Sequence, residues 1–244
     1  MLRRPFRPVS LVLAAALLLS LPGRALQPAP REAVPDVVDA PVLFESPLPA
    51  TDPVDPDWFS DAVFIGDSRT EGLLLYSTLR AGLGLTHPGL NVNTARTKAL
   101  FPLKDGKATL EEALSGGAWR KVYLMLGVNE ASWMDEGAYY DGYAALIDQL
   151  RDLLPGAQIY IQTLIPVTAA RSEIQGPDNA RLARRNELLL RLAREKRVYL
   201  VDTAAAFAPP GEPLPEELST DGLHFTKEGH HRWIDCLATH TVGL

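Results

Sequence analysis

Residues 62–69 are Ala-Val-Phe-Ile-Gly-Asp-Ser-Arg, a short apolar run that is followed by a polar turn and then by a helical pattern. The apolar run predicts a buried strand. Ser68 stands at the sharp strand-to-helix turn, where a hydroxyl projects above the sheet edge beside the free N–H groups of the helix start. A nucleophilic serine needs this geometry, because those N–H groups can stabilise an oxyanion. Serine is also a preferred helix N-cap, so the motif alone leaves a structural role open.

Two later segments carry residues that would complete such a site. Residues 121–130 are Lys-Val-Tyr-Leu-Met-Leu-Gly-Val-Asn-Glu, a second buried strand pattern that ends in Gly-x-Asn. Residues 221–229 are Asp-Gly-Leu-His-Phe-Thr-Lys-Glu-Gly, with a carboxylate and an imidazole three positions apart, just before the last helical stretch. Three ordered motifs, two of them at predicted strand ends, are far more specific than any one of them.

The order Gly-Asp-Ser, Gly-x-Asn, Asp-x-x-His resembles the SGNH (GDSL-type) hydrolase family. The runs FIGDSRTEG, YLMLGVNEAS and DGLHFTKEGH are similar to an extracytoplasmic bacterial branch of that family, and the resemblance covers roughly residues 60–240. It implies that Ser68 is the nucleophile, that His224 is its general base and that Asp221 orients the imidazole. It also implies that Asn129 and the Ser68 backbone N–H form the oxyanion hole, and that no cofactor is needed.

The chain departs from the family pattern at several positions. The family has a further glycine whose N–H is a third oxyanion donor, but residues 91–96 contain no glycine. A backbone N–H does not require glycine, so Thr94 or Ala95 can serve. We take Ala95 as the candidate for the third oxyanion donor. Glu130 stands where the family commonly has Asp, and Arg69 stands where many members have Leu.

The first 25 residues are predicted to be a secretory signal peptide. Arginines at positions 3, 4 and 7 precede an apolar run at 11–21, and Gly23-Arg24-Ala25 offers a small-x-small cleavage site. The apolar run is short for a membrane span, so we expect no stable transmembrane anchor, although an uncleaved anchor is the alternative. Either interpretation exports the domain, to the periplasm or to the exterior of the cell.

The rest of the chain divides into a linker and one domain. Residues 26–57 are rich in proline and acidic residues, which predicts an extended linker or a segment lying on the domain surface. Residues 58–244 form the predicted hydrolase domain, which is large enough for a full α/β core.

Strand and helix patterns alternate along this domain. Strands are expected at 62–66, around 90–93, and at 121–126, 158–164 and 198–202; helices are expected at 69–81, 107–115, 138–153, 179–196 and 227–239. Such alternation predicts parallel βαβ units, and the nearly continuous apolar strands predict a sheet that is covered on both faces. We therefore expect a three-layer α/β/α sandwich with a flavodoxin-like, five-stranded parallel sheet of order 2-1-3-4-5.

Composition limits the partners and ligands. The formal net charge is −6, and removal of the signal segment, which carries four arginines and no acid, takes it to −10. We therefore expect no nucleic-acid partner. The single cysteine, Cys236, lies among apolar residues and is expected to pack in the core. No metal is expected, because His230 and His231 would lie on different faces of the last helix. The sequence does not predict the oligomeric state.

The function expected from these motifs is a secreted or periplasmic serine esterase for small acyl esters, O-acetyl groups foremost, on carbohydrate or cell-wall material. The alternatives are a lipase-like or lysophospholipase-like esterase, an O-acyltransferase, and a non-catalytic glycan-binding or assembly module. Trp133 and Arg69 are the substrate-binding candidates, while packing is the other interpretation of Trp133. The many arginines of residues 179–196 are interpreted as a solvated helix face.

Overall fold

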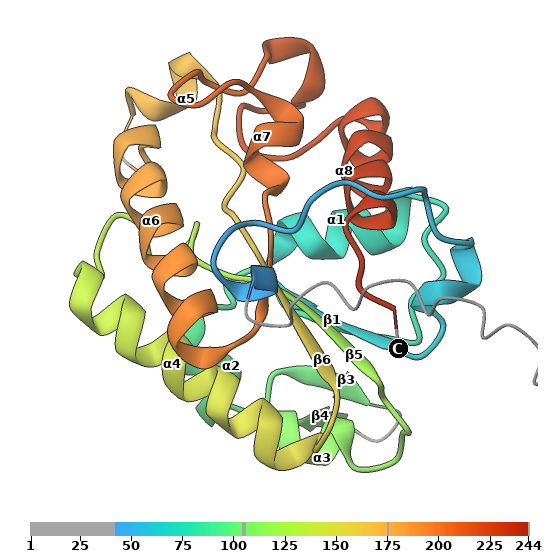
Figure 1. Cartoon of the computed structure of the whole chain (residues 1–244). Helices are drawn as coiled ribbons and strands as arrows, with labels where there is room; N and C mark the ends of the chain where they lie inside the picture. Colours follow the sequence, from blue (N-terminus) through green and yellow to red (C-terminus); the bar gives the residue numbers. More distant parts are fainter. Residues whose placement is uncertain (1–41, 104–105, 175, 244) are drawn as a thin grey trace, which may run out of the picture. The chain divides into compact units, whose positions relative to one another are not determined.

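Five parallel strands form the central sheet of this protein, whose structure is a computed structural model that describes residues 42–103, 106–174 and 176–243 (Figure 1). The strands are β1 (Ala62–Gly66), β2 (Leu83–Thr86), β5 (Lys121–Met125), β6 (Gln158–Gln162) and β7 (Tyr199–Val201). They lie in the order β2-β1-β5-β6-β7. Counted along the chain, this is the predicted order 2-1-3-4-5, because β3 (Phe101–Leu103) and β4 (Gly106–Ala108) pair only with each other. The predicted fold class is therefore confirmed.

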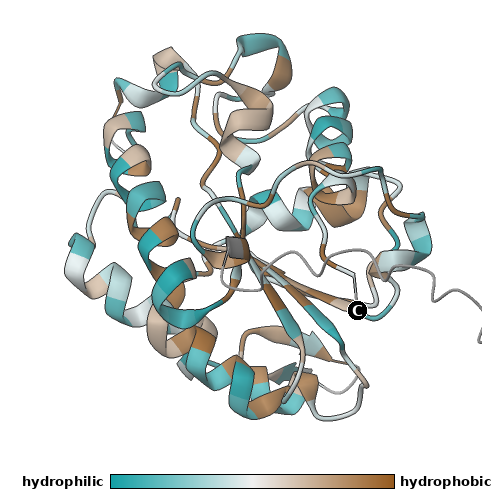
Figure 2. Cartoon of the chain, in the orientation of Figure 1, coloured by the Kyte–Doolittle hydropathy of each residue, from teal (hydrophilic) through white to brown (hydrophobic). Residues whose placement is uncertain are grey.

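Helices cover the sheet on its two faces. One group consists of α1 (Ser68–Tyr76), α7 (Thr203–Phe207) and α8 (Lys227–Thr239), which pack together. The other group consists of α2 (Val92–Thr97), α3 (Leu110–Leu114), α4 (Glu136–Leu153) and α6 (Asn179–Lys196). The short helix α5 (Ala169–Ser172) follows β6. Polar and apolar residues alternate along α6 in Figure 2, as expected for a helix with one buried face.

The centre of the sheet is buried and carries a row of aromatic rings. Every residue of β1 and β5 is buried. Phe64, Tyr123, Tyr160 and Tyr199 are neighbours in register on successive strands, and their ring centroids lie 4.7–5.0 Å apart. This in-register stacking fixes the strands relative to one another, and with them the carboxyl ends that carry the candidate site.

Three of the expected elements differ from the structure in kind or in length. The strand expected around 90–93 is instead the start of α2, whose first turn is closed by a capping box between Asn91 and Thr94. The second strand of the sheet is residues 83–86. The helix expected at 69–81 ends at Tyr76, and the region 107–115 divides into β4 and the five-residue α3.

The described part of the proline-rich segment lies on the domain. Backbone N–H groups of Leu48, Thr51 and Val54 donate to carbonyls of Leu200, Thr239 and Ala238. Residues 42–57 thus form a segment that lies on the domain surface and not a free linker. Short helical turns form at Val42–Phe44 and Pro56–Phe59. The predicted signal peptide and residues 26–41 lie outside the described residues. Among the helices described, none combines the length and the hydropathy that crossing a membrane requires.

Candidate active site

The structure brings Ser68, His224 and Asp221 into one hydrogen-bonded chain. Ser68 Oγ lies 2.9 Å from His224 Nε2, and His224 Nδ1 lies 2.7 Å from Asp221 Oδ2. The side chains of His224 and Asp221 are 39% and 52% exposed, so the chain of contacts opens to solvent. A nucleophile, a base and a group that orients the base are thereby arranged as a serine hydrolase requires.

The turn after β1 presents the serine at the start of α1. Asp67, not Ser68, is the N-cap of this helix, and its carboxylate accepts the Arg69 N–H at 2.9 Å. Ser68 is therefore the first helical residue, whose N–H has no acceptor within the helix. Since Asp67 provides the cap, the Ser68 hydroxyl is free to contact His224. Burial raises the pKa of Asp67, and the neighbouring Arg69 opposes this shift.

A tight turn before α8 holds Asp221 and His224 together. Asp221 Oδ1 accepts the backbone N–H groups of Leu223 at 2.9 Å and His224 at 2.7 Å, which leaves Oδ2 for the imidazole. Gly222 between them has φ +83°, and a Cβ there would lie 2.8 Å from Thr168 Oγ1. Only glycine adopts this conformation at such close approach without strain. The turn thus sets both ends of the Asp221–His224 contact.

The carboxylate of Asp221 is held in its charged form. Partial burial alone would raise its pKa, but hydrogen bonds from the backbone and ring of His224 and from the Leu223 N–H lower the pKa of Asp221 to about 2. Asp221 therefore remains ionised throughout the neutral range. An ionised carboxylate at Nδ1 fixes the tautomer in which Nε2 can accept a proton from Ser68.

Arg69 is a structural clamp, and its expected role in substrate binding stays a prediction. Although the residue borders the surface beside Ser68, its side chain is 1% exposed. The guanidinium donates to the carbonyls of Leu223 at 2.9 Å, Ile165 at 2.6 Å and Pro166 at 3.3 Å. Arg69 thereby ties the start of α1 to the Asp221–His224 turn and to the loop after β6. Burial lowers its pKa to about 10, so it stays charged at neutral pH.

Asn129 lies at the carboxyl end of β5, next to the end of β1 that carries Ser68. Its Nδ2 donates to the carbonyls of Pro88 at 3.1 Å and Leu90 at 3.0 Å. Ala95 does not provide the expected third oxyanion donor. Its N–H donates within α2 to the Asn91 carbonyl at 2.9 Å, and the residue is fully buried.

The neighbouring N–H groups are engaged as well. Those of Asn93 and Thr94 donate to Asn91 Oδ1, and that of Val92 donates to Glu130 Oε1 at 3.1 Å. Every backbone N–H of residues 92–95 thus donates to another group of the protein, and none of the four is left free to serve as an oxyanion donor.

Trp133 lies beside Asn129, in the turn between β5 and α4. Its indole Nε1 donates to the Asn129 carbonyl at 3.1 Å, while the side chain is 61% exposed. The ring is therefore attached to the Asn129 turn rather than packed in the core.

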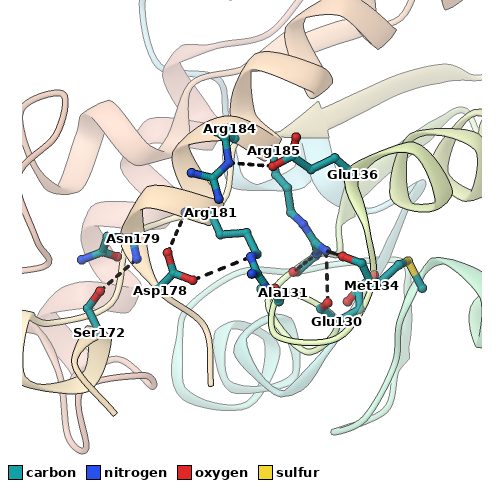
Figure 3. Close-up of polar contacts among 11 residues, drawn as sticks. Glu130, Ala131, Met134, Glu136, Ser172, Asp178, Asn179, Arg181, Arg184 and Arg185 are labelled. Atoms are coloured by element: carbon teal, nitrogen blue, oxygen red, sulfur yellow. Dashed lines mark hydrogen bonds and ion pairs between the residues drawn. The ribbon is translucent and has the colours of Figure 1, made fainter. Parts of the chain in front are cut away.

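One face of α6 holds the turn that contains Glu130, Ala131 and Met134 (Figure 3). Asn129 directly precedes these residues. Arg185 is fully buried and donates to the carbonyls of Gly127 at 2.6 Å, Glu130 at 3.1 Å and Met134 at 2.9 Å. Arg181 Nη1 donates to the Ala131 carbonyl at 2.5 Å. The interpretation of these arginines as a solvated face is therefore wrong for Arg185. The signal was its spacing, because residue 185 falls between Leu182 and Leu189 on the apolar stripe.

The same helix also holds the loop after β6, through two asparagines that the motif analysis did not find. Asn186 accepts the Leu164 N–H at 2.7 Å and donates to the Leu164 carbonyl at 3.0 Å. Asn179 makes the same pair of bonds to Val167, at 2.8 and 2.9 Å. An asparagine amide can accept from the N–H and donate to the carbonyl of one residue at the same time. Asn179 and Asn186 therefore hold this loop with the bonds that a neighbouring strand would otherwise make.

The histidines of α8 do not gather into a metal site. His230 is buried, with its ring centroid 6.0 Å from those of Tyr76 and Phe225, and burial lowers its pKa. Among the described residues, no group of three His, Cys, Asp or Glu side chains could hold a metal ion. Cys236 is buried, and burial raises the pKa of its thiol to about 12.

Glu130 is a fully buried carboxyl group, and we predict that it makes stability depend on pH. Its Oε2 has no hydrogen-bond partner among the described residues, and burial raises its pKa to about 7. A raised carboxyl pKa stabilises the fold at pH values below its ordinary pKa of 4.5, and this contribution is lost as the pH rises to about 7 and beyond. Urea unfolding at pH 5 and pH 8 should show a loss of about 1–3 kcal/mol that Glu130→Gln does not share. Glu212→Gln, at an exposed carboxylate, is the matched control, and parallel profiles for all three proteins would contradict the prediction.

With the fold and this geometry in hand, comparisons with known proteins identify the family. The model of the GDSL-like lipase/acylhydrolase family matches residues 64–232, and the chain belongs to this family. Family membership places it among ester-hydrolysing enzymes. None of the curated proteins compared with the sequence matches it.

Three solved structures illustrate the likeness. An acetyl xylan esterase named AlAXEase has a TM-score of 0.56 at 17% identity, over 72% of this chain and 96% of the other. A catalytic mutant of an acetylxylan esterase from Geobacillus stearothermophilus has a TM-score of 0.52 at 17% identity, over 72% of this chain and 91% of the other. A peptidoglycan O-acetylesterase has a TM-score of 0.50 at 20% identity, over 66% of this chain and 46% of the other. At these identities the likeness shows the shared fold.

Proposed function

We propose that this protein is an exported serine esterase that removes small acyl groups, O-acetyl groups foremost, from carbohydrate or cell-wall material. The observation that carries the proposal is the unbroken contact from Ser68 Oγ through His224 to Asp221, at 2.9 and 2.7 Å. Export is proposed from the signal-peptide pattern of the first 25 residues.

In the first step, Ser68 Oγ attacks the ester carbonyl carbon while His224 Nε2 takes the hydroxyl proton. The carbonyl π electrons move to the oxygen, and the oxyanion accepts hydrogen bonds from the Ser68 N–H and from Asn129 Nδ2. Asn129 exchanges its contact with the Pro88 carbonyl for this one. The intermediate then collapses, the bond to the leaving oxygen breaks, and His224 returns the proton to that oxygen. The products are a free alcohol and an acyl-Ser68 ester.

In the second step, water repeats the same sequence. His224 Nε2 takes a proton from water as the water oxygen attacks the acyl carbon, and the oxyanion forms in the same hole. Collapse breaks the bond to Ser68 Oγ, which recovers its proton from His224. A carboxylic acid leaves and the enzyme is regenerated. Asp221 stays ionised throughout and stabilises the imidazolium.

Two further points support the proposed acyl and alcohol classes. Export brings the protein to extracytoplasmic glycans, and the similar structures include esterases titled for acetyl xylan and for peptidoglycan O-acetyl groups. A shared fold hosts several chemistries, so the substrate class has to be tested by activity.

The test uses the full chain on 4-nitrophenyl acetate, butyrate and octanoate, with a fluorophosphonate probe alongside. We expect stoichiometric labelling of Ser68 and a kcat/KM that is highest for acetate. Preference for octanoate would select the lipase-like alternative, and acetyl transfer to a sugar in excess of hydrolysis would select the transferase. Absence of both labelling and turnover would contradict the esterase and favour the binding module.

A further inference from the structure

A groove of about 620 Å³ begins at Ser68 and His224 and runs between helices α1 and α8. One side is formed by the outer face of α1, with Glu71 and Tyr76 on it, and the other by the start of α8. The groove is therefore continuous with the reacting atoms of the proposed esterase.

The surface of α1 along this groove is more apolar than the fold requires. Among the three consecutive leucines of α1, Leu73 is buried in the core, whereas Leu75 and the following Tyr76 are each 67% exposed. Gly72 lies one turn before Tyr76, and a Cβ there would lie 3.0 Å from His230 Nε2. Because Gly72 has no side chain, the His230 ring forms the floor of the groove, and the Tyr76 ring lies beside it.

Polar side chains border this apolar strip. Glu71 on α1 and Lys227 on α8 supply charges of opposite sign, while the Thr226 hydroxyl caps α8 and is already hydrogen-bonded. Burial lowers the pKa of His230 at the floor, which favours the uncharged imidazole. An exposed aromatic ring between hydrogen-bonding groups of both signs fits a neutral ring with apolar C–H faces and many hydroxyl groups.

The position of the groove decides which part of an ester it can receive. The leaving oxygen has to reach His224 Nε2 to be protonated, whereas the carbonyl oxygen has to face the oxyanion donors. The groove is lined by His224, and no residue of the Pro88–Asn91 segment or of the Asn129 turn lines it. It therefore lies on the side of the alcohol and not on the side of Asn129.

We propose that the α1–α8 groove binds the alcohol part of the substrate, and that this alcohol is a sugar ring stacked on Tyr76. Glu71 and Lys227 contact hydroxyl groups of the same sugar. The inference rests on the proposed esterase function and adds the residues that select its alcohol. The acyl group lies on the opposite side of Ser68, toward Asn129 and Trp133.

The test compares two monoacetate esters that differ only in their alcohol, a methyl xyloside that carries a single O-acetyl group and ethyl acetate. In the full chain, Tyr76→Ala should raise the ratio of the xyloside KM to the ethyl acetate KM by about 2- to 10-fold, the range expected for loss of one aromatic contact. Tyr76→Phe should keep the wild-type ratio, because the ring face remains. Leu103→Ala removes an exposed apolar side chain on β3 and should leave both KM values unchanged.

Several outcomes would overturn the inference. An equal change in both KM values, or no change, would show that Tyr76 does not select the alcohol. A wild-type enzyme that hydrolyses ethyl acetate but not the xyloside would reject the sugar while keeping the esterase. Hydrolysis of neither ester, together with no fluorophosphonate labelling, would instead reject the proposed function itself.

Discussion

Replacing Ser68 with alanine should lower kcat on 4-nitrophenyl acetate by about 10⁶-fold, the scale of loss seen when a triad serine is removed. The hydroxyl oxygen is the atom that forms the acyl-enzyme, and no other hydroxyl group contacts His224 Nε2 among the described residues. The helix start should be unaffected, because Asp67 caps α1 and the Ser68 side chain makes no capping bond. We therefore expect an inactive protein with wild-type unfolding behaviour.

The measurement combines steady-state rates with far-UV circular dichroism during thermal unfolding. Ser115→Ala is the matched control, since Ser115 Oγ donates only to the Glu112 carbonyl at the end of α3. This control should keep full activity. Wild-type turnover by Ser68→Ala would mean that the nucleophile is another group, and the proposed mechanism would then be abandoned.

The central strands can be predicted from the sequence because they are apolar runs, and the motifs can be predicted because their residues lie close together in the chain. Continuous apolar runs at β1, β5 and β6 identify central strands without tertiary information. Ser68, Asp221 and His224 are found because a turn fixes each of them relative to its neighbours in sequence. Residues three apart, such as Asp221 and His224, need no distant contact to meet.

The wrong strand at 90–93 has a local physical cause. Leu90-Asn-Val-Asn alternates apolar and polar residues, which is the pattern of a half-buried strand. The first turn of a helix can show the same alternation over so few residues. The helix forms because the Asn91 side chain caps it locally by accepting two of its N–H groups, and because Glu130, a distant residue, accepts a third.

The functions of Arg69 and Arg185 could not be predicted from spacing alone. Each guanidinium donates to three carbonyls on other segments, and Arg69 reaches residues more than ninety positions away along the chain. Spacing can indicate that Arg185 is buried, but the carbonyls that each guanidinium holds are known only from the structure, and the charge of an arginine ordinarily predicts exposure. Together, Arg69 and Arg185 hold the turns that carry His224 and Asn129, so the site depends on contacts that no motif contains.

Asp221→Asn should lower kcat by about 10⁴-fold while the fold persists. Asn Oδ1 can still accept the N–H groups of Leu223 and His224, so the turn keeps its shape. The amide nitrogen then faces His224 Nδ1, and it donates where the carboxylate accepted. Nδ1 must become the acceptor, the ring proton moves to Nε2, and Nε2 can no longer take the proton of Ser68.

The pH dependence separates this tautomer effect from a loss of stability. Because the pKa of Asp221 is lowered to about 2, its contribution to stability is present above about pH 4 and is lost as the pH falls toward 2. Any stability difference between the variant and the wild type should therefore vanish in acid, whereas the activity difference should persist across the neutral range. Asp55→Asn, at an exposed cap that accepts the Asp57 N–H, is the matched control for the same change of group. If Asp221→Asn retained more than about a tenth of the wild-type rate, His224 would be oriented by its backbone contacts and not by the carboxylate.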